Sequence, residues 1–537
     1  MMQQTLPSIV GHLARFLGAG DAAAERAAAL ACHATQAGHV CADLAIDAGW
    51  GPWLADLDET QREAWRASLA TLAIVGRGED WTPLVWDGRR LYLRRYWDYE
   101  CRVAADLRGR AEAWIGTDTA IDQALDSAFS DVGQRTAARM ALSRRLALIS
   151  GGPGTGKTTT LARLIGLMNM QARLAGTAPP RIALAAPTGK AAARMADALG
   201  AAGEGLPAMT LHRLLGMRAG GDGFRHHRDR PLALEVLVVD EASMIDLSLM
   251  AHLLEALPPT ARLVLLGDRD QLAAVEAGAV FADLCASRCL ADCVAALTTS
   301  YRFCAESGIG RLAALLREGD APAVVDLLHA GHAGIAWQAG GQRRALITAV
   351  QAGYADYRHA VMAGLPPEEL FARFERFRVL CAHRQDADAI NRALAGGDAG
   401  QAFPGLPVMV VRNDPLLRLF NGDVGLVLAD PATGNLQAWF PGTGSAGALP
   451  RRVPLVRLPD WVPAWAMTVH KSQGSEFDEV LFVLPEADSP VMTRELVYTG
   501  VTRARRQITL WAGESVLRTA LGRRAERMSG LREKLAD

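Results

Sequence analysis

Lysine is scarce in this 537-residue chain. Of its 57 basic side chains, only Lys157, Lys190, Lys471 and Lys534 are lysines, and the rest are arginines. A lysine presents a compact ammonium, whereas an arginine presents a bulkier planar fork. We therefore expect each lysine to mark a position where a guanidinium would serve poorly.

A large net charge, long apolar runs and a disulfide framework are also missing. The formal net charge is −1, so any contact with nucleic acid must come from a local groove lined by arginine. No apolar run approaches the ~18 residues of a membrane span, and no cationic leader precedes an apolar core at the N-terminus. The eight scattered cysteines suit a reducing compartment. We expect a soluble, cytoplasmic protein without a membrane partner.

One cysteine cluster admits two interpretations. Cys285, Cys289 and Cys293 fall at i, i+4 and i+8, with Cys304 beyond them, and could be metal ligands. The usual C-x-x-C pairing of structural zinc sites is absent. This favours the alternative, in which the three cysteines form one buried face of a helix in "VFADLCASRCLADCVAAL".

Residues 1–115 are predicted to form a separate, α-rich N-terminal domain. Alanine-rich segments predict helices, and Asp87-Gly88 between apolar runs predicts a hairpin with a type I′ turn. Seven of the twelve tryptophans lie in this region. They either form ordinary core or present a docking surface for another protein, and both interpretations stay open.

Two α/β domains are predicted after this region. The runs "LALIS", "RIALAAP", "LEVLVVD" and "ARLVLLG" alternate with helical stretches within 116–297. A second set, "FRVLCAH", "EVLFVLP" and "QITLWAG", lies within 298–402 and 456–537. Such strands are typical of parallel sheets covered on both faces. Residues 403–455 are strand and turn without helix, with Asn421-Gly422 as a turn signal, and predict an inserted β-barrel.

The most specific motif lies in "SGGPGTGKTTT". Gly151 to Thr158 read G-x-x-x-x-G-K-T, directly after one strand and before a helix. In this context glycines let backbone N–H groups wrap the phosphates of a nucleotide, and the helix N-terminus adds its positive end. Lys157 is expected to bind the β- and γ-phosphate oxygens, and Thr158 to offer its hydroxyl to Mg²⁺.

Two further segments supply polar residues at strand ends. In "LVVDEAS", Asp240 and Glu241 would repel each other unless a cation lay nearby. Asp240 is therefore the candidate for the Mg²⁺ shell, and Glu241 for the base that aligns and deprotonates the attacking water. In "LLGDRDQLAAVEAG", Gln271 is placed to touch a γ-phosphate or its water, and the alternative is a solvated loop residue.

Together these motifs resemble those of superfamily-1 DNA helicases, and among them the RecD family, the alpha subunits of exodeoxyribonuclease V. The matching stretches are "SGGPGTGKTTT", "LAAPTGKAAARM", "TLHRLLG", "VVDEASMID", "GDRDQLAAVEAGAVFADL", "LTTSYRF", "NGDVG", "TVHKSQGSEFDEV" and "VYTGVTRAR". "GHVCADL" and "RRYWDYE" are similar to the family's N-terminal region. The resemblance implies two RecA-like P-loop motor domains, a small SH3-like all-β insertion and an α-rich N-terminal domain. It also implies 5′ to 3′ DNA unwinding with ATP, in a RecBCD heterotrimer with RecB and RecC subunits, in double-strand break repair and recombination.

The resemblance extends the ATP site. It implies that Gln134 recognises adenine, that Arg302 and Arg503 reach the γ-phosphate from the second motor domain, and that Glu476 lies near the ribose. The expected nucleotide-binding set is Gln134, Gly151, Gly152, Pro153, Gly154, Thr155, Gly156, Lys157, Thr158, Thr159 and Glu476. The expected catalytic set is Lys157, Glu241, Gln271, Arg302 and Arg503, and the Mg²⁺ ligands are Thr158 and Asp240.

The resemblance also implies a groove for single-stranded DNA across both motor domains. Its candidate contacts are Thr188, Lys190, Thr210, His212, Thr468, His470, Lys471 and Gln473. Hydroxyls and single ammonium groups suit phosphate contacts that carry no sequence information, and the alternative for the threonines is helix capping. The basic segment near 217–231 resembles a hairpin that could separate strands, or it is a solvated loop.

Three of the four lysines, Lys157, Lys190 and Lys471, therefore fall in motifs that grip a phosphate, while Lys534 is expected near a frayed C-terminus. No spare lysine stands beside paired acids, so we expect no nuclease site in this chain. Three alternatives remain: a stand-alone RecD-like helicase, a scaffold subunit with an inactive ATP site, and an RNA-directed motor. The intact set of ATP-site residues weighs against the scaffold.

Overall fold

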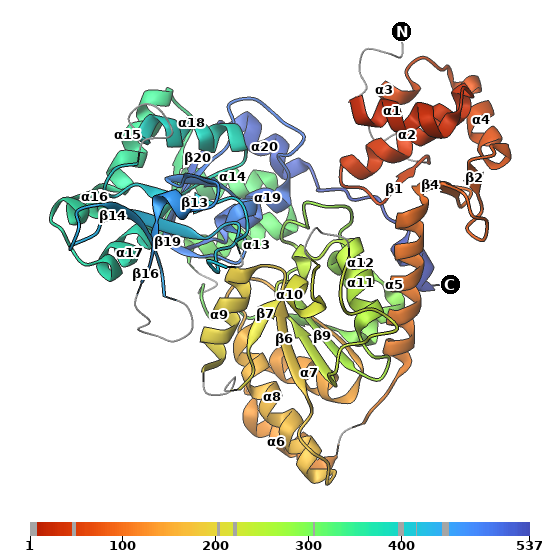
Figure 1. The fold of residues 1–537 in the computed structure, drawn as a ribbon, viewed down its shortest axis with the longest axis horizontal. Helices are drawn as coiled ribbons and strands as arrows, with labels where there is room; N and C mark the ends of the chain where they lie inside the picture. Colours follow the sequence, from red (N-terminus) through yellow and green to blue (C-terminus); the bar gives the residue numbers. More distant parts are fainter. Residues whose placement is uncertain are drawn as a thin grey trace.

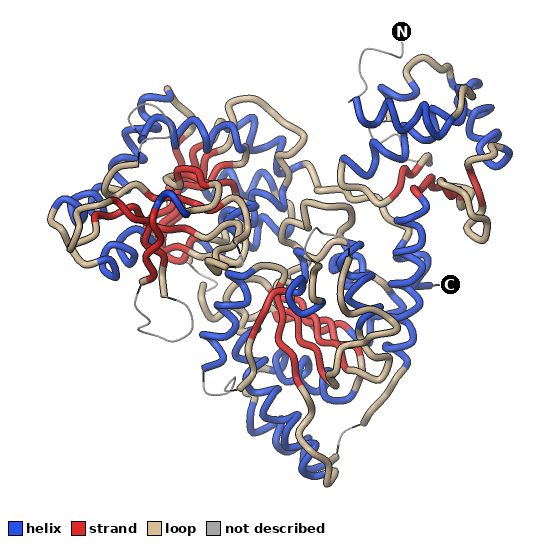
Figure 2. Tube along the Cα trace, viewed as in Figure 1, coloured by secondary structure: helices blue, strands red, loops and turns tan. Residues whose placement is uncertain are grey.

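The computed structural model describes residues 8–45, 50–116, 118–200, 205–218, 223–303, 307–395, 402–414, 416–442 and 450–536. An N-terminal unit stands at one side of two larger α/β bodies (Figure 1). The strands gather in separate sheets with helices around them (Figure 2). Among the described helices, none is both long and apolar enough to cross a bilayer.

The N-terminal unit combines short helices with a small sheet. The helices are α1 (Ser8–Gly18), α2 (Ala22–Gln36), α3 (Gly51–Leu54) and α4 (Glu59–Ser68), and the sheet order is β1 (Cys41–Asp43), β4 (Arg90–Leu93), β3 (Leu84–Trp86) and β2 (Val75–Gly76). The expected hairpin joins β3 to β4, but the Asp87 N–H donates to the Arg90 carbonyl, so the two-residue loop is Gly88-Arg89. Only Gly88 has a positive φ, 96°, which fits a type II′ turn and not the predicted type I′ turn.

The tryptophans of this region divide between core and surface. Trp50, Trp53 and Trp65 are buried, whereas Trp81 is 90% and Trp114 is 65% exposed. The core interpretation therefore holds for the first three, and the last two remain on the surface.

Helix α5 (Arg94–Glu112) runs from the N-terminal unit along the first α/β body, beside the C-terminus (Figure 1). The C-terminal helix α21 (Leu531–Ala536) packs on it. The Lys534 ammonium donates to fully buried Glu100 at 2.7 Å and lies 4.0 Å from the Trp97 ring centroid. The prediction of a frayed C-terminus was wrong, because a buried ion pair and a cation–π contact anchor this end.

The first α/β body carries the six-stranded parallel sheet that the apolar runs predicted. Its order is β10 (Val294–Leu297), β5 (Leu146–Gly151), β9 (Arg262–Gly267), β8 (Val236–Val239), β6 (Ile182–Ala186) and β7 (Ala208–Thr210). Its helices are α6 (Thr119–Ala128), α7 (Val132–Ser143), α8 (Lys157–Leu174), α9 (Gly189–Leu199), α10 (Leu211–Leu215), α11 (Leu247–Ala256) and α12 (Val280–Ala286). In β5, Leu146 and Leu148 join one core while Ala147 and Ile149 join another. The sheet is therefore buried on both faces.

The cysteine cluster does not lie on one helix. Helix α12 ends at Ala286, a 3₁₀ segment spans Arg288–Cys293, and the chain then enters β10. Cys289 is exposed while Cys293 is buried, so the predicted single buried face was wrong. Within the described residues no group of three or more His, Cys, Asp or Glu residues is arranged to hold a metal, and Cys304 lies outside them.

The second α/β body carries a five-stranded parallel sheet. Its order is β11 (Ile335–Gln338), β20 (Ala504–Trp511), β19 (Phe477–Val483), β12 (Phe377–Cys381) and β18 (Ala466–Thr468). Its helices are α13 (Gly308–Glu318), α14 (Ala321–Ala330), α15 (Arg343–Gly353), α16 (Ala355–Met362), α17 (Pro367–Arg376), α18 (Arg384–Ala395), α19 (Arg494–Val501) and α20 (Glu514–Gly522).

The all-β insertion forms a five-stranded antiparallel sheet. Its order is β16 (Arg451–Pro454), β15 (Leu436–Phe440), β14 (Val424–Ala429), β13 (Pro407–Val410) and β17 (Trp461–Pro463). The sheet runs past residue 455, because β17 pairs with β13 before the chain enters β18. Gly422 has a φ of 95° in the turn that Asn421-Gly422 predicted. The predicted class, two parallel α/β sheets with an all-β insertion and a helical N-terminal region, is confirmed.

Candidate nucleotide site and nucleic-acid interface

The loop between β5 and α8 approaches other parts of the chain so closely that it needs glycine. Gly154 and Gly156 have φ values of 77° and 81°, in the left-handed region. A Cβ on Gly154 would collide with the Cβ of Arg302, and one on Gly156 would collide with the side-chain amide of Gln134. The motif therefore sets both the shape of the loop and its distance from two predicted site residues.

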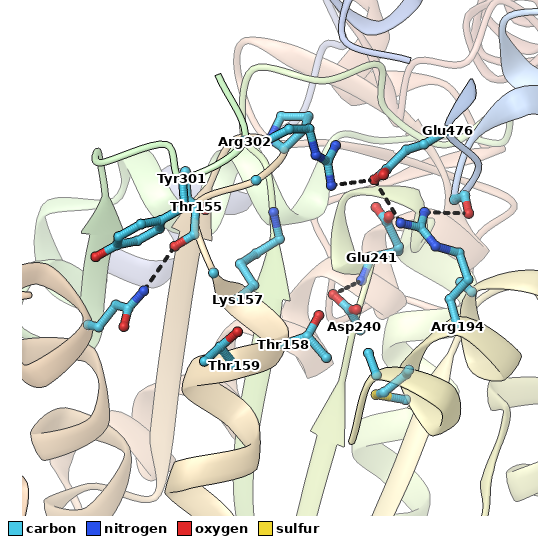
Figure 3. Close-up of a pocket in the computed structure, with 18 of the residues that line it drawn as sticks. Thr155, Lys157, Thr158, Thr159, Arg194, Asp240, Glu241, Tyr301, Arg302 and Glu476 are labelled. Atoms are coloured by element: carbon cyan, nitrogen blue, oxygen red, sulfur yellow. Dashed lines mark hydrogen bonds and ion pairs between the residues drawn. The ribbon is translucent and has the colours of Figure 1, made fainter. Parts of the chain in front are cut away.

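A cavity of about 610 Å³ opens beside this loop (Figure 3). All five predicted catalytic residues line it, namely Lys157, Glu241, Gln271, Arg302 and Arg503. The two predicted metal ligands and most of the predicted nucleotide-binding residues line it too: Gln134, Pro153, Gly154, Thr155, Gly156, Thr158, Thr159, Asp240 and Glu476. Gly151 and Gly152 lie behind it, where their carbonyls accept hydrogen bonds from the Lys157 ammonium. Segments far apart in the chain thus meet at one cavity.

Asp240 and Glu241 lie side by side at the end of β8 (Figure 3). The Asp240 carboxylate accepts the Glu241 N–H at 2.8 Å. Burial, and next the neighbouring Glu241 charge, raise the pKa of Asp240 to about 6. A cation bound beside Asp240 would offset both effects. Glu241 has a φ of 53°, a left-handed backbone that costs about 1–3 kcal/mol in a non-glycine residue and is concentrated at functional sites.

Gln271 is buried, so the solvated-loop alternative was wrong. Its side-chain amide donates to Asp268 at 3.0 Å, and the same carboxylate oxygen accepts the Tyr498 hydroxyl at 3.1 Å. The next residue, Leu272, donates its N–H to the Thr499 hydroxyl at 2.9 Å. Since Tyr498 and Thr499 belong to α19, the Gln271 segment is bonded directly to the second α/β body.

Glu476 is held by arginines from other segments. Its carboxylate lies 2.7 Å from Arg194 and 2.8 Å from Arg302 (Figure 3). Burial alone would raise the pKa of Glu476, but these positive charges outweigh burial and lower it to about 2. Arg194 also donates to the Gly474 carbonyl at 2.8 Å. Arg194 was missed by sequence analysis, although it stands one helical turn after Lys190 in a matching motif.

The two predicted γ-phosphate arginines reach the cavity from different segments. Arg302 lies between β10 and α13, where the preceding Tyr301 N–H donates to the Gly154 carbonyl at 2.8 Å. The Nη1 of Arg302 is buried and has no hydrogen-bond partner among the described residues. Arg503 follows α19 and donates to the carbonyls of Thr499 and Ser475 at 3.1 and 3.2 Å.

Gln134 and Tyr301 lie at the end of the cavity predicted to bind adenine. Gln134 is buried in the first turn of α7, and its side-chain amide donates to the Thr155 carbonyl at 3.3 Å. Tyr301 is 60% exposed, and a Cβ on Gly156 would lie 3.7 Å from its ring. Tyr301 was not among the predicted site residues, although it stands beside Arg302 in the matching stretch "LTTSYRF".

The predicted DNA-contacting threonines all cap helices or turns. Thr188 accepts the Ala191 N–H at the start of α9, Thr210 accepts the Arg213 N–H at the start of α10, and Thr468 accepts the Lys471 N–H. The capping alternative is therefore present at each position. A hydroxyl that accepts one bond can still donate another, so capping does not exclude a phosphate contact.

The other DNA candidates differ in exposure. Lys190 and Lys471 are exposed, whereas His212 and His470 are half-buried, and burial lowers the pKa of both histidines. Gln473 is buried and donates to the Leu272 carbonyl at 3.0 Å. This places the Gln473 amide at the contact between the two α/β bodies, and not in an open groove as predicted.

The described part of the basic segment near 217–231 forms a short antiparallel turn. Bridges join Met217 to Phe224 and His227 to Arg230. The Phe224 ring packs inward, while the arginines at 218, 225, 228 and 230 are exposed.

Similarity to proteins of one family extends over almost the whole chain. Residues 3–92 match the family model for the N-terminal domain of the RecBCD enzyme subunit RecD, residues 130–336 an AAA domain, and residues 463–511 a UvrD-like helicase C-terminal domain. The RecBCD enzyme subunit RecD of Mycolicibacterium smegmatis is 42% identical over 96% of this chain and 94% of that protein. The ATP-dependent RecD2 DNA helicase of Deinococcus radiodurans is 34% identical over 73% of this chain and 50% of that protein. Among solved structures, Bacteroides Pif1 bound to ssDNA has 18% identity and a TM-score of 0.43, covering 72% of this chain and 94% of that one.

Proposed function

This chain belongs to the RecD family of RecBCD enzyme subunits, and on that premise we propose that it is an ATP-dependent DNA helicase. It hydrolyses ATP to move 5′ to 3′ along a single DNA strand, as the RecD subunit of a RecBCD-type exodeoxyribonuclease V in double-strand break repair and recombination. The two α/β bodies are its motor domains.

The observation that carries the proposal is the composition of the 610 Å³ cavity. Lys157 comes from the first motor domain and Arg503 from the second, and both line it. A nucleotide held between them touches both domains at once. Hydrolysis changes the charge of the nucleotide between Lys157 and Arg503, and therefore the strength of the contact between the two domains. A motor requires such a change in domain contact with nucleotide state.

The residues at one wall of the cavity fit a divalent cation. Thr158 offers a hydroxyl and Asp240 a carboxylate, both oxygen ligands of the kind that Mg²⁺ prefers. The raised pKa of Asp240 shows that its charge is poorly compensated by the protein alone. Bound Mg²⁺ would neutralise charge on the β- and γ-phosphates.

The remaining catalytic roles follow from position. Glu241, next to Asp240 and held in a left-handed backbone, is the base that orients and deprotonates the attacking water. Arg302 keeps one buried nitrogen without a partner among the described residues, and this nitrogen would be available to donate to a γ-phosphate oxygen of bound ATP. Gln134 and Tyr301 contact the base, and Thr188, Lys190, Lys471 and His470 contact the DNA strand.

The test is ATP hydrolysis and unwinding by wild-type protein and Lys157→Gln, on duplexes with a 5′ or a 3′ single-stranded tail. We expect the wild type to unwind 5′-tailed duplexes and Lys157→Gln to lose both activities. Hydrolysis by Lys157→Gln at the wild-type rate would contradict the site, and unwinding of 3′ tails alone would contradict the direction. An RNA tail of the same sequence tests the choice of DNA.

The subunit assignment has its own support. The family model for the RecD N-terminal domain matches residues 3–92, and the chain covers 94% of a RecD subunit but half of the stand-alone RecD2 helicase. We propose that the chain assembles in the cytoplasm with RecB and RecC subunits, which supply the nuclease. Co-expression with both subunits and size-exclusion chromatography should give a ternary complex, whereas a chain that elutes alone favours the stand-alone alternative.

A further inference from the structure

A second cavity lies on the first motor domain where it meets the N-terminal unit. Its volume is about 220 Å³, and none of its residues lines the nucleotide cavity. Four elements contribute a ring each: Tyr96 at the start of α5, His212 in α10, Phe224 in the basic turn, and His252 in α11. These four rings define what is here called the ring pocket. A cavity of ~150 Å³ already admits a benzene ring, so the ring pocket is large enough for one nucleobase.

The rings of this region form a continuous series. Centroid distances are 6.1 Å from His212 to Phe224, 5.2 Å from Phe224 to His252, and 5.5 Å from His252 to Tyr99. Tyr99 is followed by Tyr96 at 6.1 Å. Flat π-surfaces bind single-stranded nucleic acid without regard to sequence, because every base has a face that can stack.

The polar groups of the ring pocket suit the edge of a base. Burial lowers the pKa values of His212 and His252. The neutral His212 imidazole offers one donor and one acceptor, whereas the ring nitrogens of His252 lie 3.4 Å from the Tyr99 hydroxyl and 3.6 Å from the Glu255 carboxylate. No hydrogen bond to a ring nitrogen of His212 is found in the described part of the chain. Asp246 also lines the pocket, but one of its oxygens caps α11 by accepting the Leu249 N–H at 2.9 Å.

The lining of the pocket itself holds one arginine, Arg95, and two acids, Asp246 and Glu276, so the positive charge that a DNA backbone requires comes from the adjoining turn. Arg95 lines the pocket and is exposed, and four exposed arginines stand on the adjoining turn, at 218, 225, 228 and 230. Exposed acids nearby are fewer, namely Glu276 in the lining and Asp229 on the turn. Phosphates can therefore lie along the arginines while a base enters the cavity that the rings line.

The pocket is also continuous with a predicted DNA contact. His212 stands two residues after Thr210, in the segment predicted to line the strand groove of the first motor domain. We propose that the ring pocket binds one unstacked nucleobase of the translocating single strand. The N-terminal unit, through Tyr96 and Arg95, then belongs to the DNA path as well as to any protein contact. This inference rests on the proposed function.

The test uses the full chain without nucleotide and single-stranded oligonucleotides that carry 2-aminopurine at one position, moved along the strand. We expect one position at which wild-type protein quenches the fluorescence by stacking. Phe224→Leu, which keeps an apolar side chain, should abolish this quenching and weaken binding about tenfold. The matched control is Phe16→Leu, since Phe16 is 80% exposed on α1, and it should bind like wild type.

An abasic nucleotide at the quenched position gives a second, independent measurement. It should weaken wild-type binding about as much as Phe224→Leu does, and should not weaken binding by Phe224→Leu any further. The inference would be overturned if wild type and Phe224→Leu bound intact DNA with equal affinity. It would also be overturned if the losses of affinity caused by the substitution and by the abasic nucleotide were additive. A loss of binding to an acidic peptide in place of DNA would likewise overturn it. A failure of the motor proposal would appear separately, as ATP hydrolysis by Lys157→Gln.

Discussion

The hydroxyl of Tyr498, in the second motor domain, donates a hydrogen bond at 3.1 Å to the carboxylate of Asp268, in the first. The same carboxylate oxygen holds the side-chain amide of Gln271, which lines the nucleotide cavity. We expect a change at the γ-phosphate that moves Gln271 to be transmitted through Asp268 to the contact between the domains. In this hypothesis Tyr498 is a positioning residue.

The first prediction concerns this bond. Tyr498→Phe removes one hydrogen bond to a carboxylate, worth about 1.5 kcal/mol or more, and should lower the DNA-stimulated rate of ATP hydrolysis about tenfold. KM for ATP should change less than kcat, because no contact to the nucleotide itself is lost. Tyr357→Phe is the matched control, since its buried hydroxyl bonds to the Gly405 carbonyl at the start of the all-β insertion, away from the contact between the motor domains. Equal losses in the two variants would contradict a coupling role.

The second prediction concerns Arg302. Arg302→Lys keeps a positive charge but loses the planar guanidinium. One nitrogen of that group lies beside Glu476, and a second nitrogen has no partner among the described residues and is available for a phosphate. Hydrolysis should fall by about 10³, the lower end of the range for such arginines, while binding of a nucleotide changes little. Single-turnover hydrolysis and fluorescent nucleotide binding separate the two effects. Arg311→Lys, an exposed position in α13, should behave like wild type.

The third prediction concerns pH and Asp240. Because the folded protein raises the pKa of Asp240 from 3.8 to about 6, the folded state binds this proton more tightly than the unfolded state does. The stability of the metal-free protein should therefore fall as pH rises from about 4 through 6, and remain low above that. Asp240→Asn removes this loss, so its melting temperature in EDTA should exceed that of wild type at pH 8 and approach it at pH 4.

Asp240→Asn should also lose Mg²⁺-dependent hydrolysis. The control is Asp229→Asn, whose side chain is 90% exposed and whose substitution should leave the melting curve unchanged at every pH. If Asp240→Asn melts below wild type at pH 8, the carboxylate is stabilised in the folded protein and the argument from burial is wrong.

The fourth prediction concerns the C-terminal anchor. Lys534→Met leaves the fully buried Glu100 carboxylate without its ammonium partner, a change that typically costs about 3–5 kcal/mol. Glu100 still accepts hydrogen bonds from Ser529 and Gly530, so we expect the lower end of that range. Thermal melting and limited proteolysis should show earlier release of α21.

A double variant isolates the charge. Glu100→Gln combined with Lys534→Met should recover part of the lost stability, because no unpaired charge remains buried. Arg524→Met, at an exposed position, should have no effect on melting. If Lys534→Met melts like wild type, the ion pair does not anchor the C-terminus.

Much of the nucleotide site followed from the sequence, because its chemistry is encoded by neighbouring residues. The loop from Gly151 to Thr158 needs glycines beside a lysine and a hydroxyl, and this spacing is readable without a fold. The parallel strands were predicted for the same kind of reason, since a strand buried on both faces is a continuous apolar run.

What the sequence could not provide depends on which surfaces meet after folding. The Arg194–Glu476 and Tyr498–Asp268 contacts join distant segments, and no local pattern marks either pair. The cysteine spacing favoured one continuous helix, but the helix ends before Cys289 and the chain continues into β10, an edge strand of the sheet. Lys534 looked like part of a loose end, and tertiary structure alone gave it Glu100 and Trp97 as partners. The sequence by itself determined the glycine, lysine and hydroxyl pattern of the loop from Gly151 to Thr158. Only the packing of the domains decided which residues connect this loop to the rest of the molecule, because side-chain contacts between segments depend on their relative placement.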